Sequence, residues 1–360
     1  MKLSLLIFAA TASAGAVPMN WLRAISPFEP GYHFTPIPKA NTSDIAAQEA
    51  RLLSEMAAAP AGNASAFAYT NLATDYNYNN FFDLFDYYTG GDPTNGFVRY
   101  VDRGTAQSQG LIKQQNGKIY IGVDNTNKAP NGRASVRMES KQRYTRGLFI
   151  LDLAHMPWGC GTWPAFWTLG DAWPTQGEID IIEGVHLQNY NSMALHTSDG
   201  CSVSGTGGTG TVQSKNCYVQ APGQGNNQGC QTHDYRTNSW GDGFNRNGGG
   251  VYAMEWNSDF IKIWFFPRGQ IPGDALNGNP EPANWGQPVG IFQGACNINQ
   301  RFNAHKIIIN VTFCGDWAGN VWSSSGCQSR AATCNDYVNN NPQDFKEAYW
   351  LVNSMKVWAS

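Results

Sequence analysis

The sequence carries little charge. Only 14% of its 360 residues are charged, against roughly 25% in typical soluble domains, and the formal net charge is −3. This balance gives no electrostatic reason to expect a nucleic acid or an anionic membrane as a partner. Beyond the first twelve residues, no apolar run approaches the length needed to span a membrane.

Motifs that bind cofactors are also missing. We find no P-loop, dinucleotide fingerprint, internal repeat or heptad pattern. The six histidines are scattered without metal-ligand spacing, and no two cysteines form a C-x-x-C pair. The sequence therefore predicts neither a metal site nor a cofactor.

Aromatic residues and glycine are abundant. Aromatics make up 13% of the chain, with 13 Trp, and there are 39 Gly. Such a composition with few charges favours a β-rich, loop-rich fold over a helical bundle. Exposed aromatic rings can pack on the C–H faces of sugars without any charge. We therefore expect an uncharged polysaccharide as partner, and a monomeric protein.

Two features predict export to an extracellular location. Residues 1–16 have the pattern of a signal peptide, with Lys2, an apolar core and small residues at the end. The eight cysteines are even in number and favour disulfides, although the sequence leaves all of about 105 pairings open. Glycan acceptor motifs begin at Asn41, Asn63 and Asn310. We expect glycans at the first two and leave the third open, because it lies in a predicted strand.

The chain divides into an N-terminal extension or linker, residues 17–74, and a catalytic domain, residues 75–360. The extension is proline-bearing and then alanine-rich, and its pattern predicts one helix over 44–58. Short β-type segments separated by turn residues fill the rest, at 118–123, 134–141, 147–153, 177–185, 193–197, 250–256, 260–266, 307–313 and 351–357. This pattern is typical of an antiparallel sandwich or barrel. We also expect long disulfide-stapled loops over 201–250 and a brief helix over 339–349.

The stretch GEIDIIEG, residues 177–184, carries three acids. Glu178, Asp180 and Glu183 are separated only by isoleucines, which favour an extended strand. Simple alternation puts Glu178 and Asp180 on one face and Glu183 on the other. One extra residue in a β-bulge at Ile181–Ile182 would return Glu183 to the face of the other two. The functional interpretation depends on this bulge.

Three converging carboxylates cannot all ionise easily, so their proton affinities must separate. A protonated acid beside an ionised carboxylate is what a retaining glycoside hydrolase requires. The alternative is a strand edge with solvated acids, the ordinary interpretation of an isolated E-x-D segment. Here the isoleucines imply a buried opposite face, and the flanking glycines leave room for a ligand to approach. Both features favour catalysis.

Residues 177–185, GEIDIIEGV, match the E-x-D-x-x-E signature of the family-16 glycoside hydrolases. The chain resembles the secreted fungal laminarinase-type endo-β-glucanases in particular. The resemblance covers residues 79 to 358 and also rests on segments 81–83, 160–167, 195–197, 264–268, 313–317 and 337–342.

This resemblance implies an all-β fold, a β-jelly-roll sandwich of two curved antiparallel sheets with a substrate cleft on the concave face. It also implies hydrolysis with retention of the anomeric configuration. In that reaction Glu178 is the nucleophile, Glu183 the general acid/base and Asp180 the assisting acid. The residues alone do not decide which glutamate attacks.

Four tryptophans are substrate-binding candidates. Trp167, Trp173 and Trp317 match aromatic positions that line the glucan groove in the resembling enzymes. Tryptophan in a β-sandwich is otherwise more often a core residue. For Trp163, a position in the substrate cleft and a position in the core are equally expected.

His196 and Arg137 complete the predicted site. By resemblance, His196 is a cleft histidine that contacts the substrate or Glu183, with a satisfied core histidine as the alternative. Arg137 is expected to hydrogen-bond sugar hydroxyls, with a surface ion pair as its alternative.

The first hypothesis is a secreted endo-β-glucanase that acts on β-1,3 glucan and also on mixed β-1,3/1,4 glucan. One alternative is a cell-wall glucan transglycosylase, which passes the same covalent intermediate to a sugar acceptor. Another is a non-catalytic β-glucan-binding module on the same fold. Wall-modifying relatives generally carry a shorter E-x-D-x-E form and binding modules typically lose the glutamates, and this chain has neither feature. The linkage preference stays open.

Overall fold

The computed structural model describes residues 68–359. Outside this range lie the expected signal peptide (1–16), the expected helix (44–58), the acceptor motifs at Asn41 and Asn63, and most of the extension (17–74). The last residues of that extension belong to the fold, since strand β1 (Leu72–Tyr76) pairs antiparallel with β18 (Trp350–Trp358).

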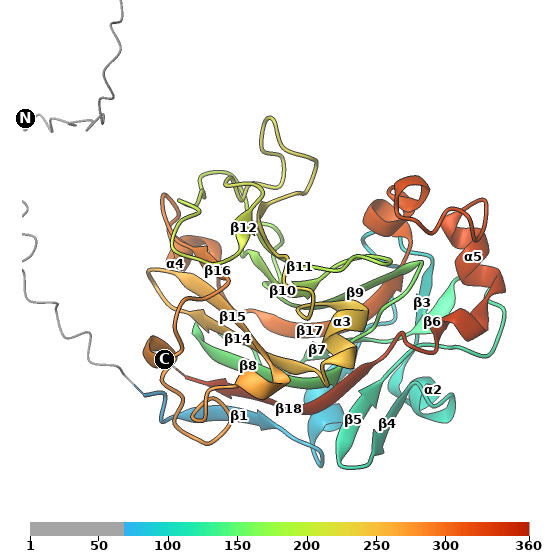
Figure 1. Cartoon of the computed structure of the whole chain (residues 1–360), viewed down its shortest axis with the longest axis horizontal. Coiled ribbons are helices and arrows are strands. Elements are labelled where there is room, and N and C mark those ends of the chain that lie inside the picture. The colour runs from blue at the N-terminus through green and yellow to red at the C-terminus, as the bar shows by residue number, and fades with distance from the viewer. Residues whose placement is uncertain (1–67, 360) are drawn as a thin grey trace, which may run out of the picture. The chain divides into compact units, whose positions relative to one another are not determined.

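Two large sheets form the structure (Figure 1). Sheet A consists of β1, β4 (Ile112–Gln115), β5 (Lys118–Ile121), β8 (Gly147–His155), β14 (Gly250–Trp256), β15 (Ile261–Pro267), β16 (Gly290–Phe292) and β18. Sheet B consists of β2 (Phe85–Tyr87), β7 (Arg137–Ser140), β9 (Thr162–Leu169), β10 (Glu178–Glu183), β11 (Asn191–His196), β12 (Thr211–Val212), β13 (Cys230–Asp234) and β17 (Lys306–Phe313). Every pair within the two sheets is antiparallel. The predicted all-β class is confirmed.

The strand order shows how the site strands are supported. Sheet A runs β16-β15-β14-β8-β18-β5-β4, and sheet B runs β12-β13-β11-β10-β9-β17-β7-β2. β10 therefore lies inside sheet B, with β11 on one side and β9 on the other. A central strand has both edges hydrogen-bonded, so its side chains are held on a rigid element.

Short elements complete the fold. A parallel pair joins β3 (Val98–Tyr100) to β6 (Arg133–Ser135). The α-helices are α2 (Arg103–Ser108), α3 (Gly241–Arg246), α4 (Ile298–Arg301) and α5 (Cys334–Asn340). Single turns of 3₁₀-helix occur at Phe81–Leu84, Arg268–Gln270, Pro282–Asn284, Trp322–Ser324 and Pro342–Phe345, and one π-helical turn occurs at Gly315–Gly319.

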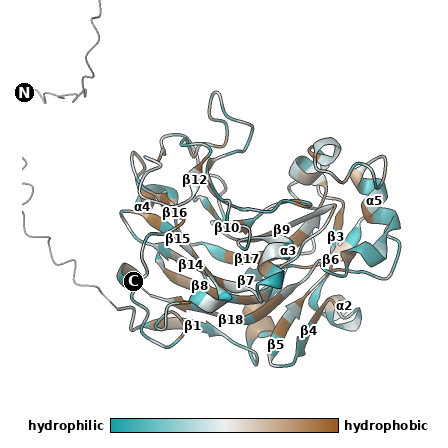
Figure 2. Cartoon of the chain, in the orientation of Figure 1, coloured by the Kyte–Doolittle hydropathy of each residue, from teal (hydrophilic) through white to brown (hydrophobic). Residues whose placement is uncertain are grey.

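The core lies between the two sheets. The three isoleucines of β10 are at most 1% exposed and belong to one apolar cluster with Phe149 and Leu151 of β8. Apolar segments, brown in Figure 2, recur along the strands, and the surrounding loops are mainly hydrophilic. Since side chains alternate along a strand, burying one face of sheet B leaves its other face free for polar groups. We call that second face the acid-bearing face.

All nine predicted strand segments contain a strand. Among the strands that were not predicted, β9 bears most on the site, because it pairs with both β10 and β17. Its sequence holds Pro164, which is rare in central strands, and aromatics on both faces that hide the alternation. The brief helix expected over 339–349 is found slightly earlier, as α5 and the turn Pro342–Phe345.

All eight cysteines are paired. The disulfides are Cys160–Cys327, Cys201–Cys296, Cys217–Cys230 and Cys314–Cys334. Two of them hold the 201–250 region, which also contains β12, β13 and α3. Among residues 68–359 no helix combines the length and apolar character needed to cross a membrane.

Candidate active site

The predicted β-bulge is present in β10. The pairing of β10 with β9 shifts by one residue between Asp180 and Ile182, so Ile181 is the extra residue. The pairing with β11 is irregular over the same interval. A one-residue shift moves every later side chain to the opposite face. Glu183 therefore shares the acid-bearing face with Glu178 and Asp180.

A buried side chain holds the bulge. Asn191, at the start of β11 and 0% exposed, donates from Nδ2 to the carbonyl of Ile181 (2.9 Å) and accepts at Oδ1 from the N–H of Glu183 (3.1 Å). A bulge disrupts ladder hydrogen bonds, and buried backbone groups must find partners elsewhere. Asn191 could not be predicted from the sequence, because no local pattern connects it with a bulge residue ten positions earlier.

Gly177 fixes the entry into β10. Its φ is +77°, and a Cβ there would lie 2.4 Å from Cδ1 of Phe302 and 2.5 Å from the carbonyl oxygen of Arg301. Only glycine combines this backbone conformation with so little space. The sequence interpretation, that this glycine leaves room for a ligand, is corrected: the neighbouring chain fills that space.

Glu178 is held by Trp173. The indole Nε1 donates a 2.5 Å hydrogen bond to Oε2 of Glu178. Burial, and after it the nearby Asp180 carboxylate, raises the pKa of Glu178 to about 7. The hydrogen bond from Trp173 opposes this rise, because it stabilises the charged form.

Glu183 has an equivalent partner in Trp163. Nε1 of Trp163 donates a 2.8 Å hydrogen bond to Oε1 of Glu183. Burial, and after it the Asp180 charge, raises the pKa of Glu183 to about 8. Burial and the Asp180 charge thus raise the pKa of both glutamates.

His196 pairs with Asp180. On β11 it stands opposite Glu178, and its Nε2 lies 3.0 Å from Oδ2 of Asp180. Burial disfavours the imidazolium, but the carboxylates of Glu178, Asp180 and Glu183 outweigh burial and raise the pKa of His196 to about 9. The cation then donates from Nδ1 to Oδ1 of Asn227 over 3.1 Å. Asn227, which no sequence pattern singles out, comes from the loop closed by the Cys217–Cys230 disulfide.

The four predicted tryptophans surround these acids. Trp163 and Trp167 of β9 are half-buried, and Trp173 is 45% exposed. Trp317, in the π-helical turn, packs edge-on against Trp163 with ring centroids 5.7 Å apart. None of the four belongs to the core clusters of the described residues.

Arg137 is no surface ion pair. It is 7% exposed and pairs with Glu139 of the same strand, with Nε 3.0 Å from Oε1. Its guanidinium also lies 5.0 Å from the ring centre of Trp167 and 4.9 Å from that of Tyr88. The arginine is therefore fixed against an aromatic wall of the acid-bearing face.

Asn310, the third acceptor motif, is built into the same wall. Its Oδ1 accepts a hydrogen bond from Nε1 of Trp167 (2.8 Å), and its Nδ2 donates to the hydroxyl of Tyr100 (3.1 Å). The residue is 6% exposed. Its amide nitrogen has no space for a glycan.

One group among the described residues has the spacing of metal ligands. Single ligand atoms of Glu178, Asp180 and His196 lie within 4.8 Å of one another. Carboxylate-driven glycoside cleavage requires no metal.

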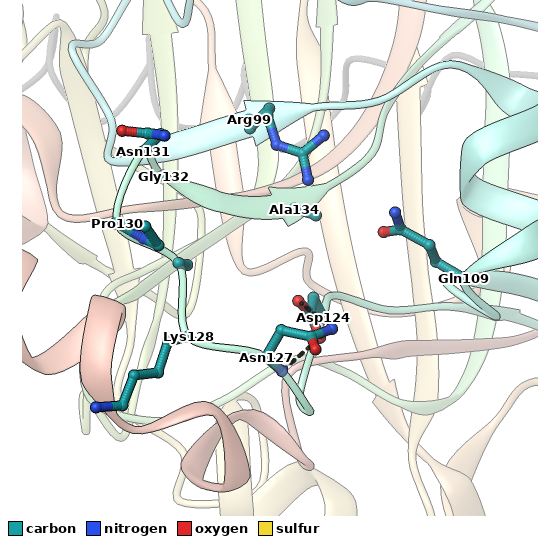
Figure 3. A pocket seen from close by; sticks show the side chains of 10 residues that line it. Arg99, Gln109, Asp124, Asn127, Lys128, Pro130, Asn131, Gly132 and Ala134 are labelled. Atoms are coloured by element: carbon teal, nitrogen blue, oxygen red, sulfur yellow. Dashed lines mark hydrogen bonds between the residues drawn. The ribbon is translucent and has the colours of Figure 1, made fainter.

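A hollow of about 270 Å³ lies apart from the acids (Figure 3). Its lining comprises Arg99, Gln109, Asp124, Asn127, Lys128, Ala129, Pro130, Asn131, Gly132 and Ala134. Asp124 accepts hydrogen bonds from the backbone N–H groups of Thr126 (2.9 Å) and Asn127 (3.1 Å), so it stabilises its own loop. We assign this hollow no chemistry.

Comparison with known families gives one match over most of the chain. The model of XgeA-like catalytic GH16 domains matches residues 85–358. A probable glycosidase of Schizosaccharomyces pombe is 46% identical over 292 residues, or 80% of this chain and 69% of that protein. An endo-1,3(4)-beta-glucanase of Arthroderma benhamiae is 47% identical over 293 residues, or 80% of this chain and 64% of that protein. For a probable endo-1,3(4)-beta-glucanase of Aspergillus fumigatus the match spans 45% of the relative's length.

Solved structures agree with this match. GH16 Laminarinase 16A from Phanerochaete chrysosporium, described with beta-glucans in both donor and acceptor sites, has a TM-score of 0.76 and 41% identity, covering 80% of this chain and 99% of that one. An elongating GH family 16 beta-1,3-glucosyltransferase has a TM-score of 0.76 and 44% identity with the same coverage.

Proposed function

Because the chain belongs to the family-16 glycoside hydrolases, we propose that it is a retaining endo-β-glucanase acting on β-1,3 and mixed β-1,3/1,4 glucans. The observation that carries the proposal is the bulge in β10, which puts two glutamates of raised pKa on one face. Each glutamate is held by its own indole N–H. Fixed carboxyl groups of unequal acidity are what double displacement requires.

In the first step, the ionised Glu178 attacks the anomeric carbon while Glu183 gives its proton to the departing glycosidic oxygen. The glycosidic bond breaks and a glycosyl ester of Glu178 forms. In the second step, Glu183 takes a proton from water, whose oxygen attacks the same carbon and releases Glu178 as carboxylate. Two inversions leave the product in the β configuration.

Asp180 and His196 tune this pair. The negative charge of Asp180 raises the pKa of both glutamates, and the imidazolium of His196 lowers both. Their contact at 3.0 Å keeps the two charges fixed between the reacting groups. We propose Asp180 as the assisting acid and His196 as a positioning residue acting through Asp180.

Substrate contacts follow from what lines the acid-bearing face. We propose that Trp163, Trp167, Trp173 and Trp317 pack on glucose rings. Arg137, stacked on Trp167, would donate to sugar hydroxyls.

Export and a monomeric state belong to the same proposal. The four disulfides support an oxidising, extracellular location, with residues 1–16 as signal peptide and 17–74 as N-terminal extension. The chain spans between 45% and 69% of the first curated relatives, so the activity is proposed for this chain alone.

Two variants and one product analysis test the proposal. Glu178→Ala should abolish hydrolysis of laminarin and leave the fold, measured by near-UV circular dichroism, unchanged. Glu183→Ala should lose activity on laminarin yet keep part of it on an aryl glycoside whose leaving group needs no proton. NMR of the first product should show the β-anomer, and an α-anomer would exclude double displacement.

Transglycosylation is the second candidate. The specific observation in its favour is the 44% identity with the elongating glucosyltransferase. Reducing-sugar release from laminarin and lichenan, compared with the appearance of products longer than the substrate, separates the two activities.

A further inference from the structure

Beyond Glu183, the acid-bearing face continues across two more strands. Glu183 stands opposite Ser192 of β11, and Ser192 stands opposite His233 of β13. Residues paired in an antiparallel sheet point to the same side. His233 therefore lies on the acid-bearing face, about 10 Å from Glu183 when each strand adds about 4.8 Å.

This position lies at the Glu183 end of the acid cluster. At the other end of β11, His196 is the residue opposite Glu178. The proposed mechanism has Glu183 protonate the departing oxygen, so the leaving part of the glucan must extend past Glu183. Residues near Ser192 and His233 are thus where the leaving sugar would lie.

Three rings gather there. The ring of Tyr190 lies 4.5 Å from that of His233 and 4.9 Å from that of Tyr235, measured between centroids. Tyr190 lies two residues before Ser192, and Tyr235 lies two residues after His233. Ser192 and His233 both point to the acid-bearing face. Tyr235 is 53% exposed although it is large and apolar. Exposed aromatic surface beside a site is what a sugar ring can pack on.

His233 presents an unused polar atom. It is 8% exposed, and its Nδ1 lies 3.0 Å from the hydroxyl of Tyr235. Burial lowers the pKa of His233 to about 4, so the ring is neutral. When Nδ1 accepts from Tyr235, Nε2 carries the hydrogen, and this buried Nε2 has no partner among the described residues. A buried donor without a partner costs free energy that a ligand hydroxyl would recover.

Space for a ligand adjoins these rings. A hollow of about 330 Å³ is lined by Thr209, Thr211, His233, Asp234, Tyr235 and Arg236. Its volume falls within the range of about 300–1,000 Å³ that is usual for small-ligand sites. The two charged members, Asp234 and Arg236, form an ion pair with each other at 2.6 Å. The remaining hydroxyl, imidazole and aromatic groups suit a neutral, hydroxyl-rich ligand.

We propose that Tyr190, His233 and Tyr235 form an acceptor-side subsite, which binds a glucosyl unit of the leaving part of the glucan or of an incoming acceptor chain. The proposal rests on the proposed function. In the second role, an acceptor hydroxyl gives its proton to Glu183, its oxygen bonds to the anomeric carbon, and Glu178 is released. A filled subsite would thus direct the glycosyl ester towards transfer rather than hydrolysis.

The test compares a short and a long substrate. An aryl β-laminaribioside places only its aryl group past Glu183, whereas laminariheptaose also fills sites farther along. Tyr235→Ala should lower kcat/KM for laminariheptaose about tenfold and leave kcat/KM for the aryl substrate within about twofold. It should also lower the ratio of transfer to hydrolysis products when laminaribiose is added as acceptor.

Two further variants sharpen the test. Tyr235→Phe keeps the ring and loses only the hydroxyl. It should therefore lower kcat/KM for laminariheptaose less than Tyr235→Ala does. Tyr78→Ala, in the turn between β1 and the 3₁₀ turn Phe81–Leu84, is the matched control and should leave kcat/KM unchanged for both substrates. If Tyr235→Ala leaves kcat/KM unchanged for both substrates, or lowers kcat/KM equally for both, the subsite is refuted. A wild-type protein inactive on both would instead refute the proposed function.

Discussion

The side chain of Asn191 accepts a hydrogen bond from the backbone N–H of Glu183, with Oδ1 3.1 Å from the nitrogen. The same amide donates to the carbonyl of Ile181, so one residue satisfies two backbone groups within the bulge of β10. The position of Glu183 therefore depends on a side chain from the neighbouring strand.

Asn191→Ala should loosen the bulge. The buried N–H of Glu183 and carbonyl of Ile181 would lose their partner, at a cost of about 1–3 kcal/mol in the free energy of unfolding. Urea unfolding measures this loss, and kcat on laminarin should fall as Glu183 moves. Asn189→Ala, at an exposed position two residues earlier, should change neither. A stable and fully active Asn191→Ala variant would contradict the role given to the amide.

The two indole hydrogen bonds predict two separate shifts in the pH profile. Activity needs Glu178 ionised and Glu183 protonated, so log(kcat/KM) should fall on the acid side as Glu178 gains a proton and on the alkaline side as Glu183 loses one. The acid side should respond to the pKa of about 7 and the alkaline side to that of about 8.

Trp173→Phe removes a bond that stabilises the Glu178 carboxylate, so the acid side should move to higher pH by about half a unit or more. Trp163→Phe does the same to Glu183, so the alkaline side should move to higher pH. The pH dependence of kcat/KM on the aryl substrate measures both, and each variant serves as control for the other. Shifts to lower pH would show that the indoles do not stabilise the charged forms.

Glu183→Gln should stabilise the protein at neutral and alkaline pH. The folded-state pKa of Glu183 is raised above the ordinary value of 4.5, so its contribution to stability is fully present below 4.5 and is lost as the pH rises towards about 8. A neutral amide escapes this loss and can still accept from Trp163. We expect a gain of about 1–3 kcal/mol in unfolding free energy at pH 8 and little change at pH 4.

Urea titrations at the two pH values measure this difference. Asp259→Asn, an exposed carboxyl, is the control and should show no such pH-dependent gain. Equal effects of Glu183→Gln at pH 4 and pH 8 would mean that ionisation of Glu183 does not strain the folded state.

Asn227 should act through His196. Asn227→Leu removes the acceptor for Nδ1, so the imidazolium becomes less favourable and its electrostatic support for both glutamates weakens. We expect kcat to fall about tenfold with little change in KM, and both sides of the pH profile to move to higher pH. Asn227→Asp, which keeps the acceptor oxygen, should restore most of the rate, and Asn226→Ala should be neutral. A lower rate with an unmoved pH profile would indicate only structural damage.

Much of the fold could be predicted from local patterns. Strands such as β14 and β17 are runs of apolar and β-branched residues between turns, and the five-residue spacing of Glu178 and Glu183 predicted the bulge in β10. The carboxylates Glu178, Asp180 and Glu183 could be predicted because all three lie in a single short segment of the sequence. Strand β9 was missed, because Pro164 and aromatics on both faces conceal its alternation.

The supporting residues could not be found in this way. Asn191 and Asn227 belong to the site only through the register of β10 against β11 and through a loop closed by the Cys217–Cys230 disulfide. The same holds for His233, which reaches the acid-bearing face by pairing across two strands. Such relationships arise from tertiary pairing, and no spacing along the chain records them.

The buried amide of Asn310 also bears on how the protein can be produced. Its motif is a legitimate acceptor for the oligosaccharide-transferring machinery, which meets chains before they fold, yet the folded molecule uses this amide to hold Trp167 and Tyr100. A sugar attached early would have to be accommodated inside a central strand. In a glycosylating host, the yield of native protein would thus depend on whether the sheet forms faster than Asn310 is glycosylated. Replacing Thr312 would destroy the motif and leave Asn310 itself, but it would also remove the hydrogen bond that the buried Thr312 hydroxyl donates to Asp92 (2.6 Å).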